Sequence, residues 1–234
     1  MANELPDKDT INGIITIDKE KNWTSHDVIA FIRNHFGIKK AGHGGTLDPN
    51  ATGLLIVLLG NATKLSDTFL NHDKEYLCRV TLGETRDTGD IEGNILSVSN
   101  VTATHEEILS AIFELVGEIE QIPPMFSAKR HNGKRLYELA RKGIAIERKP
   151  SLIHIKEIEI IDIKIPDIIF KVLCSKGTYI RGLAVSIGEK LSCGAYLSDL
   201  RRLKSGNFDL SKSFTPSQLK TMEKNKFYES VSRI

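Results

Sequence analysis

The chain of 234 residues has 40% hydrophobic and 26% charged residues and a net charge of +2, the composition of an ordinary globular protein. Its longest aliphatic run covers only residues 54–59, too short to cross a membrane, and its first residues lack the pattern of a signal peptide. The three cysteines are scattered, which argues against a disulfide framework or structural zinc, so we expect a reduced, cytoplasmic protein.

The first part of the chain predicts a strand, a helix and two further strands. Residues 13–18 alternate weakly, as is typical of a strand. A cap at Thr24 or Ser25 starts a helix whose apolar residues recur at helical spacing. After a glycine-rich turn, strands are expected at residues 54–59 and 75–82.

The second part predicts more helices and a pair of isoleucine-rich strands. Thr104 opens a capping box ahead of a helix. The strand pair is expected at 152–161 and 168–174, and the later helices at 135–142, 178–191, 195–203 and from Thr215 onward. Together these elements predict an α+β fold with a mixed, largely antiparallel sheet flanked by helices, in one domain spanning residues 1–234.

The string GHGGTLDPNATG, residues 42–53, is the most informative stretch. It presents one carboxylate, Asp48, between small residues and a proline that restricts the backbone. Loops held by rigid neighbours often carry catalytic groups. An aspartate beside glycine and proline is also an ordinary turn former, so a plain turn remains the alternative. A phosphate-binding loop is disfavoured because no Gly-Lys-Ser/Thr follows the glycines.

Positive charge is concentrated in residues 129–149, which hold eight cationic and two anionic side chains. Their net charge is +6, so the remainder of the chain sums to −4. Clustered cations gain free energy by releasing counterions from a nucleic-acid backbone. The segment is therefore a candidate phosphate-binding element, with a solvated surface helix as the alternative. The cations that we expect to contact nucleic-acid phosphates are Lys129, Arg130, Lys134, Arg135 and Arg141.

Several motifs resemble those of the TruB family, the tRNA pseudouridine-55 synthases, and the likeness covers most of residues 12–208. The string around Asp48 resembles the family's catalytic motif, in which this aspartate is the catalytic residue. The motif that ends at Tyr76 is similar to one whose tyrosine stacks on the target base. The motif that ends at Arg181 resembles one whose arginine pairs with the catalytic acid. The resemblance implies a pseudouridine synthase-like fold.

The same resemblance implies further contacts with the substrate. The acidic loop that ends at Asp90 is similar to one that contacts substrate, and the stretch around Leu200 resembles one near the active site. The motif that starts at Pro123 resembles the beginning of an RNA-gripping insertion, which gives this insertion bounds of about 123–150. Other candidates for RNA contact are His43, Lys64 and Lys19.

Each of these side chains also has a structural alternative. A strand tyrosine such as Tyr76 usually packs in the core, and an arginine that starts a helix, such as Arg181, is usually a surface cation. His43 can brace the turn and Asp90 can close one. Lysines such as Lys64 and Lys19 more often serve solvation or bind a phosphate than take part in chemistry.

The residue types suit the conversion of uridine to pseudouridine. This reaction breaks the C1′–N1 bond, rotates uracil and joins C5 to C1′, without oxidation or energy input, so we expect neither a metal nor a nucleotide cofactor. An ionised carboxylate can attack the base or the ribose, or assist deprotonation, and a guanidinium favours the ionised form. The target base must leave its stack, at a cost of a few kcal/mol. An aromatic platform returns ~1–3 kcal/mol of that cost.

The leading hypothesis is a stand-alone, monomeric enzyme that modifies the T-loop of tRNA at position 55, with no obligate protein partner and no membrane association. A guide-RNA-dependent relative is one alternative, although such proteins rely on further domains. An RNA-binding module without activity is another, opposed by the intact set of Asp48, Tyr76 and Arg181. A nucleotide-binding enzyme ranks last. We expect the small C-terminal RNA-binding domain of many bacterial members to be absent, leaving a short helical tail after Phe208.

Overall fold

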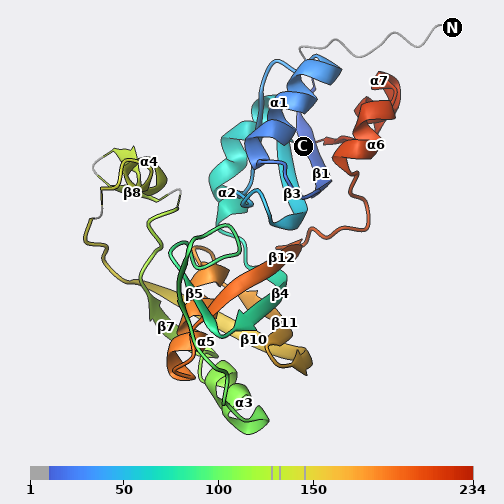
Figure 1. Cartoon of the computed structure of the whole chain (residues 1–234). Helices are drawn as coiled ribbons and strands as arrows, with labels where there is room; N and C mark the ends of the chain where they lie inside the picture. The colour runs from blue at the N-terminus through green and yellow to red at the C-terminus, as the bar shows by residue number, and fades with distance from the viewer. Residues whose placement is uncertain (1–10, 128, 132, 145, 234) are drawn as a thin grey trace, which may run out of the picture. The chain divides into compact units, whose positions relative to one another are not determined.

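The computed structural model describes residues 11–127, 129–131, 133–144 and 146–233, apart from the side chains of Arg130, His131 and Arg135 (Figure 1). The helices are α1 (Ser25–Phe36), α2 (Ser66–Leu70), α3 (His105–Phe113), α4 (Leu136–Ala140), α5 (Ile180–Lys190), α6 (Pro216–Thr221), α7 (Lys224–Glu229) and the 3-10 helix η1 (Gly60–Leu65). No helix within these ranges is long and apolar enough to span a membrane.

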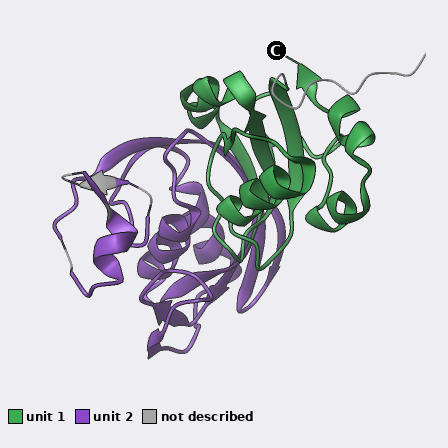
Figure 2. Ribbon diagram, turned by 90° about the horizontal axis from the view of Figure 1, so that it is seen from above, with its two compact units in different colours: residues 1–76, 200–234 green, residues 77–199 purple. Residues whose placement is uncertain are grey.

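The chain forms two compact units, coloured separately in Figure 2. Unit 1 consists of residues 1–76 and 200–234, and unit 2 of residues 77–199. No linker marks this division in the sequence, because strands β4 (Lys74–Leu82) and β12 (Ala195–Ser205) each begin in one unit and end in the other. The prediction of a single domain stays a prediction.

Unit 1 contains sheet strands in the order β13-β1-β3-β12, and β2 also pairs with β3. The strands that lie wholly in this unit are β1 (Gly13–Lys19), β2 (Ala41–His43), β3 (Thr52–Leu59) and β13 (Ser232–Arg233). β1 runs antiparallel to β3, with Ile14 opposite Leu58. β12 runs parallel to β3, with Arg202 opposite Gly53. The loop that contains Asp48 lies between β2 and β3.

β3 forms the core of unit 1 because every residue after Thr52 is buried. A strand covered on both faces is typically a continuous apolar run, as residues 54–59 are. One face packs Leu54, Ile56 and Leu58 with Phe69 of α2. This packing gives the loop before β3 a rigid base.

The helices of unit 1 begin at local signals in the sequence. Thr24 caps α1 in a reciprocal capping box with Asp27, and Gly37 ends the helix in the left-handed conformation. Near its end, Phe36 stacks on Phe227 of α7 with ring centroids 3.8 Å apart. The predicted start of α1 is confirmed, with Thr24 as the cap.

Unit 2 contains sheet strands in the order β12-β4-β11-β10-β7. Its strands are β5 (Glu84–Arg86), β6 (Ile95–Val98), β7 (Gly117–Gln121), β8 (Arg130–His131), β9 (Lys134–Arg135), β10 (Ser151–Lys164) and β11 (Asp167–Cys174). β10 is antiparallel to both β11 and β7. Helix α3 contacts α5 and β10. The predicted α+β fold with a largely antiparallel sheet is confirmed.

Two helix predictions need correction. The helix predicted at 195–203 is wrong, because these residues belong to strand β12. Their apolar residues recur at a spacing that is also typical of a helix. The segment is nevertheless a strand because it pairs with strands that are distant in the sequence. The helix predicted at 135–142 is confined to Leu136–Ala140.

Candidate active site

Asp48 lies in the loop that joins β2 to β3, residues 44–51, which we call the Asp48 loop. At its start the Gly44 amide donates to the Ile56 carbonyl at 2.9 Å, which continues the pairing of the two strands. At its end the Ala51 amide donates to the Asp48 carbonyl at 3.1 Å, which closes a tight turn. Asp48 is half-buried, so its side chain keeps access to the surface.

Ser25, the first residue of α1, holds the loop next to Asp48. Its Oγ accepts a hydrogen bond from the Leu47 amide at 2.8 Å and donates one to the Leu47 carbonyl at 3.1 Å. A hydroxyl can do both at once. Both residues are buried. Because Leu47 is fixed in this way, the position of the following aspartate is restricted.

Lys19, at the end of β1, is fully buried. Its Nζ donates to the carbonyls of Trp23 at 2.6 Å, Glu20 at 3.1 Å and Pro49 at 3.1 Å. An ammonium carries three protons, which these three carbonyls can accept. Lys19 therefore braces the segment after Asp48. RNA contact by Lys19 stays a prediction.

Arg202 of β12 contacts the chain on both sides of Asp48. Its Nη2 donates to the Gly45 carbonyl at 3.0 Å, and its Nη1 makes a longer bond of 3.4 Å to the Thr46 carbonyl. Its Nε donates to the Leu54 carbonyl at 2.7 Å. Only 2% of the residue is exposed. A buried guanidinium thus joins the start of the loop to the strand that follows it.

Two glycines allow this close packing. A Cβ atom on Gly44 would lie 2.5 Å from the Cβ of Phe69. Gly53 has a φ of +97°, a conformation that side-chained residues rarely adopt, and a Cβ there would collide with the Arg202 carbonyl. Gly44 and Gly53 therefore allow neighbouring segments to approach closely, in addition to allowing the chain to turn.

His43 and Lys64 lie in elements next to the start of the loop. His43 ends β2, and its Nδ1 accepts a hydrogen bond from the Gly45 amide at 3.4 Å, in keeping with the bracing alternative. Lys64 is exposed on η1, which contacts β2. RNA contact by either residue stays a prediction.

Tyr76 and Leu200 are the other candidate residues in unit 1. Tyr76 is 9% exposed and shares a face of β4 with the buried residues Cys78 and Val80. This placement resembles that of a core residue, and stacking on a base stays a prediction. Leu200 is half-buried in β12, and its carbonyl accepts a long hydrogen bond of 3.5 Å from the Thr52 hydroxyl.

In unit 2 the structure brings Arg181 and Asp90 together. The Arg181 Nη1 lies 3.2 Å from the Asp90 Oδ2, and the two side chains are 8% and 15% exposed. Arg181 also donates to the Phe126 carbonyl at 2.8 Å and, more weakly, to the Thr88 carbonyl at 3.4 Å. This ion pair and its backbone contacts hold the guanidinium in place. The predicted pairing of Arg181 with Asp48 stays a prediction.

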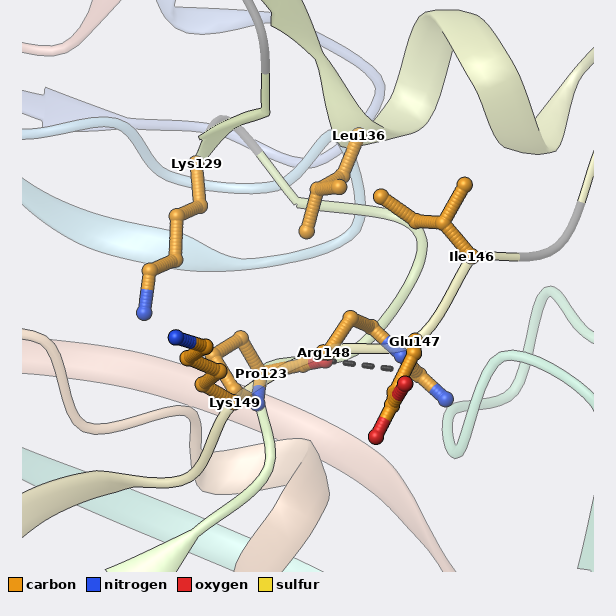
Figure 3. A pocket seen from close by; sticks show the side chains of 7 residues that line it. All are labelled: Pro123, Lys129, Leu136, Ile146, Glu147, Arg148 and Lys149. Carbon is orange, nitrogen blue, oxygen red and sulfur yellow. Dashed lines mark hydrogen bonds between the residues drawn. The ribbon is translucent and has the colours of Figure 1, made fainter.

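The basic segment, residues 129–149, lines a cavity of about 580 Å³ (Figure 3). Its walls are formed by Pro123, Lys129, Leu136, Ile146, Glu147, Arg148 and Lys149. The Arg148 Nη1 donates to the Pro123 carbonyl at 3.1 Å, the bond drawn dashed in Figure 3. The cavity therefore combines aliphatic side chains with cationic ones.

The structure describes the side chains of three of the five predicted RNA-binding cations in this segment. Lys129, Lys134 and Arg141 are exposed, and the Arg141 guanidinium lies over the Tyr137 ring, 5.5 Å from its centroid. The side chains of Arg130 in β8 and Arg135 in β9 lie outside the described residues, as do Ala128, Asn132 and Ala145.

Sequence comparison matches two consecutive segments of the chain to known domains. The TruB family pseudouridylate synthase (N terminal domain) matches residues 33–180, which is more than half of the chain. The chain belongs to the TruB family. The tRNA pseudouridylate synthase B C-terminal domain matches residues 181–233, which include β12, α6 and α7. The expected absence of a further RNA-binding domain stays a prediction.

Named TruB relatives match over nearly the full chain. The tRNA pseudouridine synthase B of Protochlamydia amoebophila is 47% identical over 213 residues, covering 91% of this chain and 81% of the relative. That of Chlamydia felis is 48% identical over 211 residues, covering 90% and 87%.

Solved structures resemble the TruB fold of this chain. A Cbf5-Nop10-Gar1 complex matches with a TM-score of 0.73 and 31% identity, covering 94% of this chain and 60% of that one. An H/ACA RNP bound to a substrate RNA containing 2′-deoxyuridine matches with a TM-score of 0.69 and 28% identity, covering 94% and 59%. The match therefore spans about three fifths of the matched chain in each of these structures.

Two residues that support the TruB motif were not predicted from the sequence. Ser25 was interpreted only as a possible helix cap, and Arg202 lay in a segment predicted to be helical. Both act through hydrogen bonds to backbone atoms of a distant segment. A serine just after a helix cap and an arginine in an apolar stretch are weak signals, since neither identifies its partner.

Proposed function

We propose that this TruB family member isomerises uridine to pseudouridine at position 55, in the T-loop of tRNA, with Asp48 as the catalytic residue. The observation that carries the proposal is a loop, braced from three sides, that presents one half-buried carboxylate. Relatives 47% identical to the chain are named tRNA pseudouridine synthase B, which supports tRNA as the substrate.

The proposed chemistry needs an ionised carboxylate at a flipped uridine. The C1′–N1 bond breaks, the uracil turns, C5 bonds to C1′, and the proton lost from C5 is balanced by one gained at N1. Asp48 acts as the nucleophile, towards base or ribose, or assists removal of the proton. Tyr76 is the proposed platform for the base. Arg181 is the proposed charge partner that favours the ionised form of Asp48.

The proposed RNA grip uses cations outside the Asp48 loop. Lys64 is exposed on η1, and Lys129, Lys134 and Arg141 are exposed in the basic segment, where phosphates can reach them. The cavity of this segment offers aliphatic walls beside cations, which suits a nucleotide more than a bare phosphate. A monomeric state and a cytoplasmic location stay predictions of the sequence.

The test is pseudouridine formation on an unmodified tRNA transcript, mapped by position. Wild-type protein is expected to modify position 55 without an added guide RNA. Asp48→Asn keeps the side-chain volume but removes the ionised oxygen, so turnover is expected to vanish while RNA binding remains. The matched control is Asp162→Asn, which alters an aspartate paired with Lys164 on β10.

Each result has a defined consequence. Substantial pseudouridine formation by purified Asp48→Asn would overturn the catalytic assignment. Modification at another position would overturn the assigned site. Activity that appears only with a guide RNA would favour the guide-dependent alternative.

A further inference from the structure

We propose that Arg202 is a positioning residue for the reaction, whose guanidinium fixes the backbone of the Asp48 loop so that the carboxylate is presented to the substrate. This rests on the proposed function. Arg202 is distant in sequence from every residue of the loop, and no other side chain described above bonds to the loop's first residues and to β3 together.

The pattern of hydrogen bonds requires a guanidinium. Three different nitrogens donate to carbonyls of two segments, Gly45 and Thr46 before Asp48 and Leu54 after it. A planar fork with donors on three nitrogens can reach all three acceptors, whereas the ammonium of a lysine is a single point. Charge-assisted bonds of this kind are shorter and stronger than neutral ones.

The charge of Arg202 is directed at the backbone. In the part of the chain that the structure describes, its side-chain partners are all carbonyl oxygens, and no carboxylate pairs with it. A buried cation is costly unless it is well hydrogen-bonded. Its presence at 2% exposure therefore favours a role in fixing the loop over a role in surface charge.

The backbone of the same residue secures the other end of the loop. Arg202 lies opposite Gly53 in the parallel ladder between β12 and β3. The positive φ of Gly53 leaves no room for a Cβ against the Arg202 carbonyl. One residue therefore contacts the exit from the loop through its main chain and the entry through its side chain.

Arg201 provides a matched control in the adjacent position. Its Nη2 forms an ion pair with Asp18 at 2.6 Å, and the side chains are 35% and 24% exposed. Arg201 is also an arginine of β12, but its guanidinium pairs with a carboxylate on β1, whereas that of Arg202 bonds to the Asp48 loop. Arg201→Lys keeps a cation in reach of Asp18 without touching the bonds to Gly45 and Leu54.

The experiment compares Arg202→Lys and Arg202→Gln with Arg201→Lys in the full chain, using an unmodified T-arm RNA. Arg202→Lys is expected to lower the rate at saturating RNA by roughly 100-fold, because a small misplacement of a reacting group has an effect of this order. The dissociation constant for RNA is expected to stay within about threefold, since the loop's surface is retained. Arg201→Lys is expected to retain its rate.

Hydrogen exchange separates positioning from general stability. In the Arg202 variants, amides of residues 44–51 are expected to exchange faster, while those of β1 remain protected. A general loss of packing would instead raise exchange in both segments. If the wild-type protein forms no pseudouridine, the proposed function is overturned. Hydrogen exchange of residues 44–51 and of β1 in the wild type and the Arg202 variants then still tests whether Arg202 fixes the loop.

Three results would overturn the proposal. One is a wild-type saturating rate in Arg202→Lys. Another is faster exchange throughout β1 as well as the loop, which would assign Arg202 to stability. The third is that both Arg202 variants fail to fold while Arg201→Lys folds. This result would also assign Arg202 to the stability of the fold.

Discussion

Arg181 and Asp90 form a largely buried ion pair, and the two backbone carbonyls that Arg181 also contacts fix its guanidinium further. Arg181→Lys keeps the charge but loses the fork of donors. Losing a hydrogen bond to a charged group costs about 1.5–3 kcal/mol, which corresponds to roughly a 10- to 100-fold lower rate if the bond matters in the transition state. Single-turnover rates at saturating RNA measure this loss.

The control for Arg181 is Arg79→Lys, which changes an exposed arginine on β4 in the same unit. It is expected to leave the rate unchanged. A fully active Arg181→Lys would show that only the charge matters there, or that the residue takes no part in the reaction.

Tyr76 is 9% exposed on a face of β4 that carries core residues, so its replacement affects both packing and RNA. Tyr76→Phe keeps the ring and is expected to bind RNA as the wild type does. Tyr76→Ala loses the platform, worth ~1–3 kcal/mol, so RNA binding is expected to weaken by roughly 5- to 150-fold. Binding assays on variants that keep their thermal transition measure this effect.

The variants Tyr76→Phe and Tyr76→Ala also test the role of the Tyr76 hydroxyl. If Tyr76→Phe binds RNA normally but does not turn over, the hydroxyl moves a proton in the reaction. If Phe and Ala variants bind and turn over alike, the tyrosine is a packing residue and the proposed platform is wrong.

Helix α1 places Ser25 beside the Asp48 loop, so the stability of its first turn bears on the site. Thr24 and Asp27 form the capping box there. Thr24→Ala is expected to lower the free energy of unfolding by about 1 kcal/mol, measured by urea denaturation. Thr68→Ala, at an exposed position of α2, is the control and is expected to cost less, because it removes no cap.

Hydrogen bonds from the Thr24 side chain and backbone lower the pKa of Asp27 below its usual value of 3.8. A carboxyl whose pKa is lower in the folded state stabilises the fold above its unfolded pKa, and this contribution is lost as pH falls through the folded pKa. The difference in unfolding free energy between wild type and Asp27→Asn is therefore expected to shrink as pH falls from neutral to below 3.8. A constant difference would contradict this role of the charge.

Elements with local signals were predictable from the sequence, and elements that depend on distant partners were not. Caps at Thr24 and Thr215 mark the beginnings of α1 and α6 in the residues themselves. Strand β12 was predicted as a helix because its pairing with β3 involves residues about 150 positions away. The candidate site divides in the same way, since Asp48 lies in a recognisable motif while the bonds of Arg202 depend on the folded chain.

Charge is distributed unevenly over the whole molecule, in a way that the net charge of +2 conceals. The basic segment carries +6 and the remainder −4. Counterion release depends on the cations that meet phosphates and not on the net charge. RNA affinity is therefore expected to depend on salt more steeply than the net charge suggests.

If three or four cations of the basic segment meet phosphates, log affinity for a T-arm stem-loop falls with log salt at a slope of roughly −2 to −4. Replacing Arg130, Lys134, Arg135 and Arg141 together by Gln is expected to flatten this slope and raise KM, with little change in the saturating rate. The control replaces four exposed lysines elsewhere, Lys156, Lys164, Lys190 and Lys224, and is expected to retain the slope. Equal slopes and equal KM in the wild type and the first variant would show that the segment is a solvated surface.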